Sequence, residues 1–395
     1  MSKYFILGHF GGFNTGDEAM LGGFLNLVPK TSAVSIKYKN GVNVHWGDNV
    51  TLFHGSYTDF VAPIGPGDTL VLCGGTHFHD DYSPIRLLRH WLYLARINYL
   101  FDQAKRKGAQ TQCIGNGFGP INEGITGWLT RQFIKLCDVV TVRDKNSARA
   151  LAALDCKADL VHPDLAMLLY KPDRRVVKEN IIGVSLTSLT SQSADTISDD
   201  VLVNSIADEL TTFSATNPDA LVRLFVIRSG NRESDAPIMN QLHQQLQSNG
   251  VQSEVYEFTN DLSELVEQMI PCRVFLASRF HSAVLGAVTQ NKLIILSYHK
   301  KLVSLAEEMT MDRRYVIDLQ QPTAATKINH LADTIGELYS ANQLNYSFPE
   351  TEILQLGEHV RTIYEEGLDF RVHANLRRAP QPGEPFVPAA TRAAL

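Results

Sequence analysis

The sequence predicts an α/β protein made of two Rossmann-like, doubly wound domains that face each other across a cleft. Short apolar runs alternate with longer amphipathic segments along most of the chain. This alternation is typical of parallel sheets that carry helices on both faces. A chain of 395 residues is also too long for one ordinary hydrophobic core. The polar stretch 171–178 interrupts the alternation, so we place the boundary between the domains after residue 172.

The first domain, residues 1–172, is expected to form its strands from the short apolar runs and its helices from the amphipathic segments. The expected strands are residues 4–8, 33–38, 50–54, 69–73, 111–115, 139–142 and 160–162. The expected helices are residues 17–27, 84–107, 126–137 and 145–154. The longest of them repeats apolar side chains at the spacing of one helix face, namely Leu87, Leu88, Trp91, Leu92, Ala95 and Tyr99.

The second domain, residues 173–345, repeats the pattern at a similar size. Its expected strands are residues 181–186, 221–227, 253–258, 274–277, 292–296 and 315–318. Its expected helices are residues 199–213, 234–248, 262–269, 282–289, 302–309 and 325–341. A helix in the segment 346–376 is expected to pack back across a domain. The tail 377–395 is rich in proline and alanine and is expected to be disordered.

Composition and charge exclude several classes of protein. The net charge of −6 and the absence of a Lys- or Arg-rich run argue against a nucleic-acid partner. No apolar run is long enough to span a membrane, and the short apolar start is expected to be a strand, not a signal peptide. The five cysteines form no CxxC pair, which indicates reduced thiols and a cytoplasmic location, with membrane-peripheral contact left open. No strongly amphipathic basic helix is evident.

In such sheets ligands bind beyond the carboxyl ends of the strands, so residues just after a strand carry the most functional weight. The loop after the first expected strand contains Asn14, Asp17 and Glu18. It carries neither a dinucleotide fingerprint nor a P-loop, and its acids would repel a phosphate. We expect these three side chains to bind neutral hydroxyls or to supply a base. The alternative is that the two acids only complement the helix dipole.

The expected strand 69–73 leads into a loop that contains His77, His79, Asp80 and Asp81. A metal site is weakly supported because no other ligand cluster accompanies them, so no metal is predicted. We expect His79 and Asp80 to line the cleft, the alternative being a solvated polar loop. Residues 116–121 are expected to form a turn after a strand at the edge of the cleft.

Cations follow several strands. Arg143 ends the expected strand 139–142 and either points into the cleft or pairs with Asp144. Arg279 and His281 follow the strand 274–277 and precede a helix. Arginine offers a fork of donors for a carboxylate or phosphate, and histidine exchanges a proton near neutral pH. The alternative is a salt-bridged Arg279 beside a capped histidine. Arg228 and Lys301 occupy comparable places and would complete a ring around one anion.

These segments, taken in order, resemble the polysaccharide pyruvyl transferase family. The family's motifs are a GNxGDEA-like segment, a GGG-rich strand end, a GxGxGP turn, a VRD-x-x-S strand end, a DxA segment, an R-x-H pair and a YxxK-like stretch. The matching residues here are Asn14 to Ala19, Gly74 and Gly75, Gly115 to Pro120, Val142 to Asp144 with Ser147, Asp164 to Ala166, Arg279 to His281, and Tyr298 with Lys301.

The resemblance implies the architecture of the B-type glycosyltransferases, with an N-terminal acceptor side and a C-terminal donor side. It also implies phosphoenolpyruvate as donor substrate, with no cofactor, and a saccharide acceptor, free or lipid-linked, whose hydroxyl pair becomes a pyruvate ketal. On this hypothesis Arg279, with Arg228 or Arg143, holds the donor's anions and His281 is the general acid. Asp17, Glu18 or His79 would be the base.

Two other functions remain open at this point. A nucleotide-sugar-dependent glycosyltransferase would share the fold, and donor choice would distinguish it. A non-catalytic saccharide-binding protein would keep an acceptor cleft without needing the cations. The sequence is compatible with a homo-oligomer but does not specify one.

Overall fold

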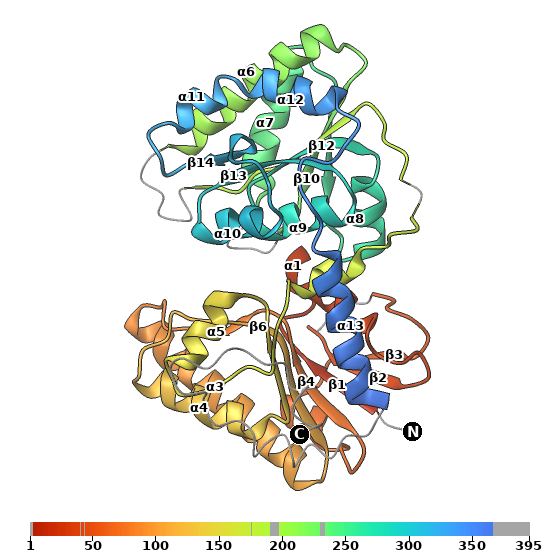
Figure 1. The fold of residues 1–395 in the computed structure, drawn as a ribbon, viewed down its shortest axis with the longest axis vertical. Coiled ribbons are helices and arrows are strands. Elements are labelled where there is room, and N and C mark those ends of the chain that lie inside the picture. The colour runs from red at the N-terminus through yellow and green to blue at the C-terminus, as the bar shows by residue number, and fades with distance from the viewer. Residues whose placement is uncertain are drawn as a thin grey trace, which may run out of the picture.

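The computed structural model describes residues 3–365, apart from residues 40, 43, 175, 190–196 and 230–233, and for residues 359–365 it describes only the backbone. Two α/β domains lie one above the other, each a parallel sheet covered by helices (Figure 1). The predicted two-domain parallel α/β fold is therefore confirmed. The tail 377–395 lies outside the described residues.

The N-terminal sheet has the strand order β3-β2-β1-β4-β6-β7-β8, and the short β5 pairs with β6. Its strands are β1 (Lys3–Leu7), β2 (Ala33–Lys37), β3 (Val50–Phe53), β4 (Thr69–Cys73), β5 (Thr76–Phe78), β6 (Gln110–Phe118), β7 (Val139–Val142) and β8 (Leu160–Val161). Its helices are α1 (Thr15–Leu25), α2 (Tyr57–Val61), α3 (Pro84–Arg106), α4 (Ile125–Leu136), α5 (Lys145–Ala152) and the 3₁₀ helix η1 (Leu165–Leu169). Apolar side chains from both faces of the sheet form two buried clusters, which explains why β4 is buried at every position.

The C-terminal sheet has the order β11-β10-β9-β12-β13-β14, and all its pairs are parallel. Its strands are β9 (Ile181–Ser185), β10 (Leu221–Val226), β11 (Ser253–Glu257), β12 (Cys272–Ala277), β13 (Lys292–Ser297) and β14 (Val316–Asp318). Its helices are α6 (Asp199–Thr216), α7 (Ala236–Ser248), α8 (Leu262–Met269), α9 (Phe280–Val288), α10 (Lys300–Glu308), the 3₁₀ turn η3 (Arg313–Tyr315), α11 (Ala324–Ile328) and α12 (Leu331–Ser340).

In both sheets the first strand is central, and the order of the strands reverses beside it. The reversal lies between β1 and β4 in one sheet and between β9 and β12 in the other. Loops at the carboxyl ends of the strands flanking such a reversal form a binding crevice. The loops after β1, β4 and β12 carry the motifs singled out in the sequence, so the topology gathers them at the cleft.

Two predicted elements were wrong. Residues 116–118 belong to β6 and not to a turn, because β5 adds a short parallel pairing to Gly117 and Phe118. The single helix expected over residues 325–341 is two helices, α11 and α12. The break is stabilised by the Glu209 carboxylate, which accepts a hydrogen bond of 2.8 Å from the backbone N–H of Ala332 at the start of α12.

The side of α3 that packs on the sheet differs from the apolar face noted in the sequence. The residues of α3 that are buried are His90, Leu94, Ile97, Leu100, Phe101 and Ala104. Leu88, Leu92 and Tyr99 instead lie on the solvent side, each more than half exposed. The helix therefore carries two apolar faces, of which the fold buries one.

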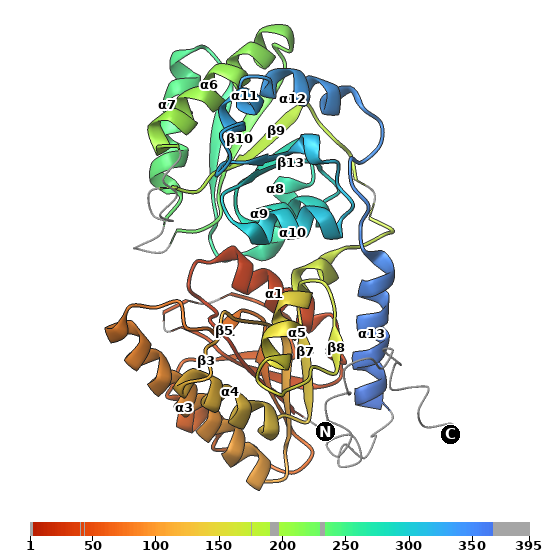
Figure 2. The ribbon, with the colours of Figure 1, turned by 60° about the vertical axis from the view of Figure 1, so that its left-hand side comes forward.

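The domains meet through α1 and the segment after β10. The backbone N–H of Thr15 donates to the Ile227 carbonyl, and that of Ser229 donates to the Phe13 carbonyl, each at 3.2 Å. The final described helix, α13 (Glu350–Glu365), runs alongside the N-terminal domain (Figure 2). Its Leu356 belongs to a buried cluster of that domain. In the part of the chain that the structure describes, no helix is long and apolar enough to cross a bilayer.

Candidate active site

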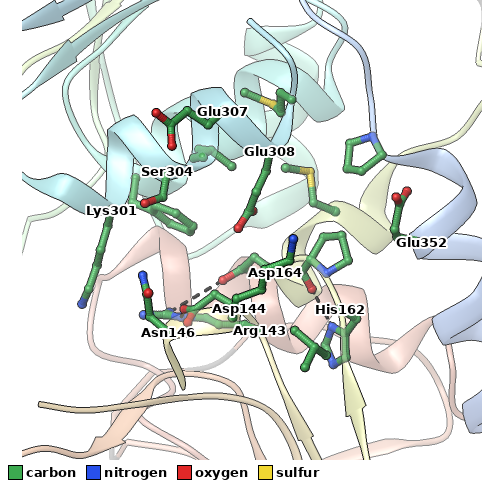
Figure 3. Close-up of a pocket in the computed structure, with 18 residues that line it drawn as sticks. Arg143, Asp144, Asn146, His162, Asp164, Lys301, Ser304, Glu307, Glu308 and Glu352 are labelled. Atoms are coloured by element: carbon green, nitrogen blue, oxygen red, sulfur yellow. Dashed lines mark hydrogen bonds and ion pairs between the residues drawn. The ribbon is translucent and has the colours of Figure 1, made fainter. Parts of the chain in front are cut away.

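A cavity of about 360 Å³ lies between the two domains at the carboxyl edges of the sheets (Figure 3). We call it the interdomain cavity. The N-terminal domain contributes Arg143, Asp144 and Asp164, and the C-terminal domain contributes Phe280 and Lys301. Glutamates of α10 and α13 line the far wall, namely Glu307, Glu308 and Glu352. The fold thus brings two of the predicted cations, one from each domain, into one site.

Arg143 directly follows β7 and is nearly buried, with 9% of its surface exposed. Its Nη2 donates to Thr76 Oγ1 at 2.8 Å, and its guanidinium carbon lies 5.6 Å from the centre of the Phe280 ring. Its Nε lies 3.6 Å from Asp144 Oδ2, and its Nη1 lies 3.7 Å from Asp164 Oδ2. Both alternatives from the sequence hold, because Arg143 faces the cavity and also pairs with Asp144.

His281, at the start of α9, forms a pair with Asp164 across the domain boundary. The distance from His281 Nε2 to Asp164 Oδ2 is 3.6 Å, longer than a hydrogen bond. Both atoms are buried, and neither has a hydrogen-bond partner among the described residues. Burial alone would raise the pKa of Asp164, but His281, Arg143 and the Ala166 N–H together lower it below the usual range. The carboxylate is therefore ionised and aimed at the imidazole.

The glycine at position 16 makes room for this imidazole. A Cβ placed on Gly16 would lie 2.1 Å from His281 Nδ1. Asn14 caps α1 at the same point, since its Oδ1 accepts from the Gly16 N–H at 3.3 Å. The first loop of one domain thus sets the position of the histidine of the other.

Lys301, the second residue of α10, brings a second cation to the cavity. Its side chain keeps access to solvent, yet surrounding protein atoms lower the pKa of the ammonium, as does the charge of Arg143. The charge of Lys301 in turn helps to lower the pKa of His79, after the effect of burial. Both cations line the same cavity and interact electrostatically, an arrangement that an anion bound between them would stabilise.

Arg279 lies elsewhere and does not line the interdomain cavity. Its Nε donates to both carboxylate oxygens of Asp235, at 2.9 and 2.7 Å, and its Nη2 donates to Oδ1 at 2.6 Å. The Asp235 side chain is fully buried. The salt-bridge alternative is therefore the one observed, and this pair fixes the loop that precedes His281.

A second hollow, of about 640 Å³, lies on the other side of the first loop. We call it the loop hollow. It contains Asn14, Asp17 and Arg228, together with His9 and the basic residues Lys37 and Lys39. Asn14 Nδ2 donates to Asp17 Oδ2 at 2.7 Å. Burial raises the pKa of Asp17, although His9, His281 and Arg228 oppose that effect.

His9 also lines a third hollow, of about 300 Å³, which we call the aromatic hollow. Tyr82, Tyr93, Arg86 and Arg89 surround it. His77 lies deep in its wall, where its Nδ1 is 2.7 Å from the Tyr93 hydroxyl. Burial lowers the pKa of His77 well below its usual range and that of His90 to about 4, so both rings are neutral near pH 7.

Besides Arg279 and His281, three predicted site residues line none of these hollows, namely His79, Asp80 and Glu18. The His79 ring packs against that of Tyr82, with 4.4 Å between the ring centres. Asp80 Oδ2 accepts a hydrogen bond of 2.5 Å from the Asn122 N–H, which ties two loops together. Glu18 is completely buried. Its Oε1 accepts from the Gly11 N–H at 2.6 Å, and its Oε2 accepts from the Tyr38 hydroxyl at 2.8 Å. Glu18 therefore stabilises the conformation of the first loop through its hydrogen bond with the Gly11 N–H.

Replacing Glu18 with glutamine is expected to change how stability depends on pH. Burial raises the pKa of Glu18 to about 7, above its ordinary value of 4.5. Between pH 4.5 and 7 Glu18 is therefore protonated in the native state but ionised in the unfolded chain. The free energy of unfolding consequently falls as pH rises through that window. Relative to Glu18→Gln, the wild type should lose up to about 3 kcal/mol of unfolding free energy between pH 4.5 and 8.

Urea denaturation at several pH values measures this difference. Glu123→Gln, at an exposed position, is the control and should leave the pH dependence unchanged. Parallel stability curves for wild type and Glu18→Gln would contradict the expectation.

Known protein families include one that matches most of this chain. The family model for polysaccharide pyruvyl transferase matches residues 14–300. The chain belongs to the polysaccharide pyruvyl transferase family. The match includes Asn14, Arg143, Asp164 and His281, and it ends just before Lys301. A search of curated proteins finds no match.

Solved structures agree with the architecture of this pyruvyl transferase family member. A protein from Listeria monocytogenes described as a UDP-N-acetylglucosamine 2-epimerase aligns with TM-score 0.55 and 9% identity, over 98% of this chain and 99% of that one. The MnaA–UDP structure from S. aureus aligns with TM-score 0.53 and 11% identity, over 92% and 97% of the two chains. At these identities the likeness concerns the fold alone.

Several residues in or beside the candidate site were not predicted as site residues from the sequence. Asp164 was named only as part of a motif, although its position just after the expected strand 160–162 was a usable signal. His9 likewise directly follows the strand expected at 4–8. Asp235 had no signal, because it precedes a helix and meets Arg279 only in three dimensions. In the described residues no group of three or more His, Cys, Asp or Glu side chains could hold a metal ion.

Proposed function

We propose that this transferase moves the pyruvyl group of phosphoenolpyruvate to a pair of sugar hydroxyls and forms a pyruvate ketal. The observation that supports the proposal most strongly is that Arg143, Lys301 and Asp164 line one interdomain cavity, and that Asp164 in turn lies 3.6 Å from His281 Nε2, just outside the lining residues. In the reaction, two C–O bonds form at the central carbon of the donor, and its bond to the phosphate oxygen breaks. The carbon–carbon double bond of the donor becomes a single bond as its methylene carbon gains a proton. Of the two protons that the hydroxyls release, one balances the proton gained by the methylene carbon and the other leaves with phosphate.

Arg143 and Lys301 are the residues that we assign to the donor. Phosphoenolpyruvate carries a carboxylate and a phosphate, so its site needs at least two cations. Arginine suits a planar carboxylate, and a lysine ammonium suits phosphate as a point charge. Because Arg143 and Lys301 repel each other when the site is empty, an anion between them removes that repulsion. Arg279 is assigned a positioning role, because Asp235 occupies its fork.

His281 is assigned as the general acid that protonates the methylene carbon. Asp164 orients the ring and compensates the charge that the imidazole carries when protonated, the role of a carboxylate behind a catalytic histidine. Asp17 is assigned as the base for the attacking hydroxyl. Its raised pKa makes it a stronger base than an exposed aspartate, and it lies close enough to His281 to feel its charge.

The acceptor is assigned to the loop hollow and the aromatic hollow, which share His9. Asn14 and Asp17 offer hydrogen-bond partners for hydroxyls, and Tyr57 and Tyr82 contribute apolar ring surface to the lining of the two hollows. Lys37, Lys39 and Arg228 make the loop hollow cationic, which favours an acceptor that itself carries negative charge.

Calorimetry with phosphoenolpyruvate and a panel of nucleotide sugars tests the donor. Phosphoenolpyruvate is expected to bind, and Lys301→Ala is expected to weaken binding by about tenfold or more through the loss of one charge-assisted contact. Lys300→Ala is the matched control, because Lys300 begins the same helix but does not line the cavity. The affinity of the Lys300→Ala variant for phosphoenolpyruvate should stay within about twofold of that of the wild type.

Other outcomes are informative. Binding of a nucleotide sugar in place of phosphoenolpyruvate would transfer the assignment to glycosyl transfer. Equal losses in Lys300→Ala and Lys301→Ala would show that only overall charge matters, and the donor site would have to be placed elsewhere.

A further inference from the structure

Exposed apolar side chains are concentrated on two neighbouring helices of the N-terminal domain. Half of the large apolar side chains that are exposed in the described residues lie on α3 and α4, namely Ile85, Leu88, Leu92, Tyr99, Ile125 and Trp128. Their exposed fractions run from 49% for Ile125 to 75% for Ile85. Because scattered surface leucines are normal, this gathering on one face is the feature that needs an explanation.

The two helices lie side by side, so their exposed side chains form one surface. Trp91 Nε1 on α3 donates to Thr126 Oγ1 on α4 at 2.9 Å, and Asn98 Nδ2 donates to the Leu129 carbonyl at 3.2 Å. Both views show the pair covering the outer side of the N-terminal sheet, away from the other domain (Figures 1 and 2). On α3 the exposed residues 85, 88, 92 and 99 follow a heptad spacing and so share one stripe.

The same helices are basic in a protein that is acidic. Together α3 and α4 contain seven Lys and Arg residues and one Asp, whereas the whole chain has a net charge of −6. Arg89 and Arg96 lie on the exposed side of α3, and Lys135 lies on that of α4. An apolar stripe flanked by cations fits the interface of an anionic bilayer, where apolar side chains enter the acyl boundary and cations meet headgroups.

We propose that the outer face of α3 and α4 docks on the surface of a membrane that contains anionic lipids. A second copy of the chain fits the face less well. A two-fold interface through this face would bring the basic α3 and α4 of both copies into one contact, where an excess of like charges is costly. No such repulsion opposes docking on negatively charged headgroups.

The docked orientation has a consequence for the acceptor. Arg86 and Arg89 belong both to this basic helix and to the wall of the aromatic hollow, so the hollow opens at the end of the docking face. An acceptor sugar joined to a lipid through phosphate would reach the hollow from the bilayer, with the arginines beside its phosphate. This consequence rests on the proposed function, whereas the docking itself does not.

Co-sedimentation of the full chain with lipid vesicles, without substrates, tests the docking. The wild type is expected to bind vesicles with about one-third phosphatidylglycerol and to bind pure phosphatidylcholine much more weakly. Leu88→Ser with Leu92→Ser should weaken binding at least tenfold. The matched control, Val201→Ser with Leu354→Ser, replaces two exposed apolar side chains on other helices and should bind as the wild type does.

A second readout locates the contact. Of the three tryptophans, Trp128 is on the proposed face and is 55% exposed. Brominated lipids should therefore quench the fluorescence of the wild type more strongly than that of Trp128→Phe, which keeps only the half-buried Trp91 at the contact of the two helices. Failure of the wild type to bind anionic vesicles, or equal binding by the Leu88/Leu92 variant, would overturn the proposal. A wild-type dimer that the Leu88/Leu92 variant converts to a monomer, without vesicle binding, would assign the face to a second copy.

These outcomes are separable from those of the proposed reaction. Vesicle binding is measured without donor or acceptor, and Leu88 and Leu92 line none of the hollows assigned to substrates. Turnover of a water-soluble saccharide by the Leu88/Leu92 variant should match that of the wild type. A protein that docks but does not use phosphoenolpyruvate would contradict only the proposed function.

Discussion

Replacing His281 with glutamine is expected to lower kcat by about 10²–10⁴-fold, the range that a positioned general acid contributes. Glutamine keeps a polar side chain beside Asp164 but cannot transfer a proton. Since His281 is not assigned to the anionic groups of the donor, affinity for phosphoenolpyruvate should change by less than about threefold. The loss should therefore appear in kcat and not in donor binding.

The measurement is phosphate release from phosphoenolpyruvate, with whichever member of a saccharide panel supports turnover by the wild type. His243→Gln is the matched control, because His243 is also half-buried in the C-terminal domain but contacts only Ser253 Oγ, at 2.9 Å, among the hydrogen bonds described for it. Its kcat should be that of the wild type. A His281→Gln enzyme with wild-type kcat would remove His281 from the role of acid.

Replacing Gly16 with alanine is expected to lower kcat by about 10²-fold, the effect of misplacing a catalytic group by about 1 Å. The new Cβ would lie 2.1 Å from His281 Nδ1, a distance that no atom pair tolerates without movement. The imidazole would have to turn away from the loop, and its alignment with Asp164 would be lost. A methyl group on one domain would thus disable a histidine of the other.

Two comparisons separate this effect from general damage. Gly336→Ala is the control, because a Cβ at Gly336 meets no atom within 4 Å and the helix around it favours alanine. Combining Gly16→Ala with His281→Gln should cost no more kcat than His281→Gln alone, since both act on one group. Additive losses in the double variant would mean that Gly16 acts through something other than His281.

Much of the fold could be predicted from the sequence because the patterns that mark strands and helices are local. The alternation of apolar runs and amphipathic segments gives strands such as β4 and β13 to within a residue or two, since buried parallel strands must be apolar throughout. Element breaks were predicted less well. The division of residues 325–341 depends on Glu209, which is distant in sequence and meets Ala332 only in the folded chain.

The site shows the same division between local and distant information. Arg143, His281 and Lys301 were predicted as candidate site residues because each follows the carboxyl end of a strand, and in a parallel sheet these ends lie along one edge. The role of Arg279 could not be predicted, because its partner Asp235 lies 44 positions away. Glu18 was placed in the wrong environment, since nothing in the sequence tells an acid at a helix start whether Tyr38 and Gly11 will enclose it.

The sequence by itself determined the two parallel α/β domains, the family and the set of residue types available for chemistry. Those properties follow from hydrophobic periodicity and from the order of the motifs, both of which are patterns in the linear sequence. Only the tertiary structure decided which cations meet, which carboxylate faces His281 and which side of α3 is buried. Each of those outcomes depends on contacts between distant segments: the position of Gly16 against another domain, the pairing of Asp235 with Arg279, and the packing of α3 against the sheet on one of its two apolar faces.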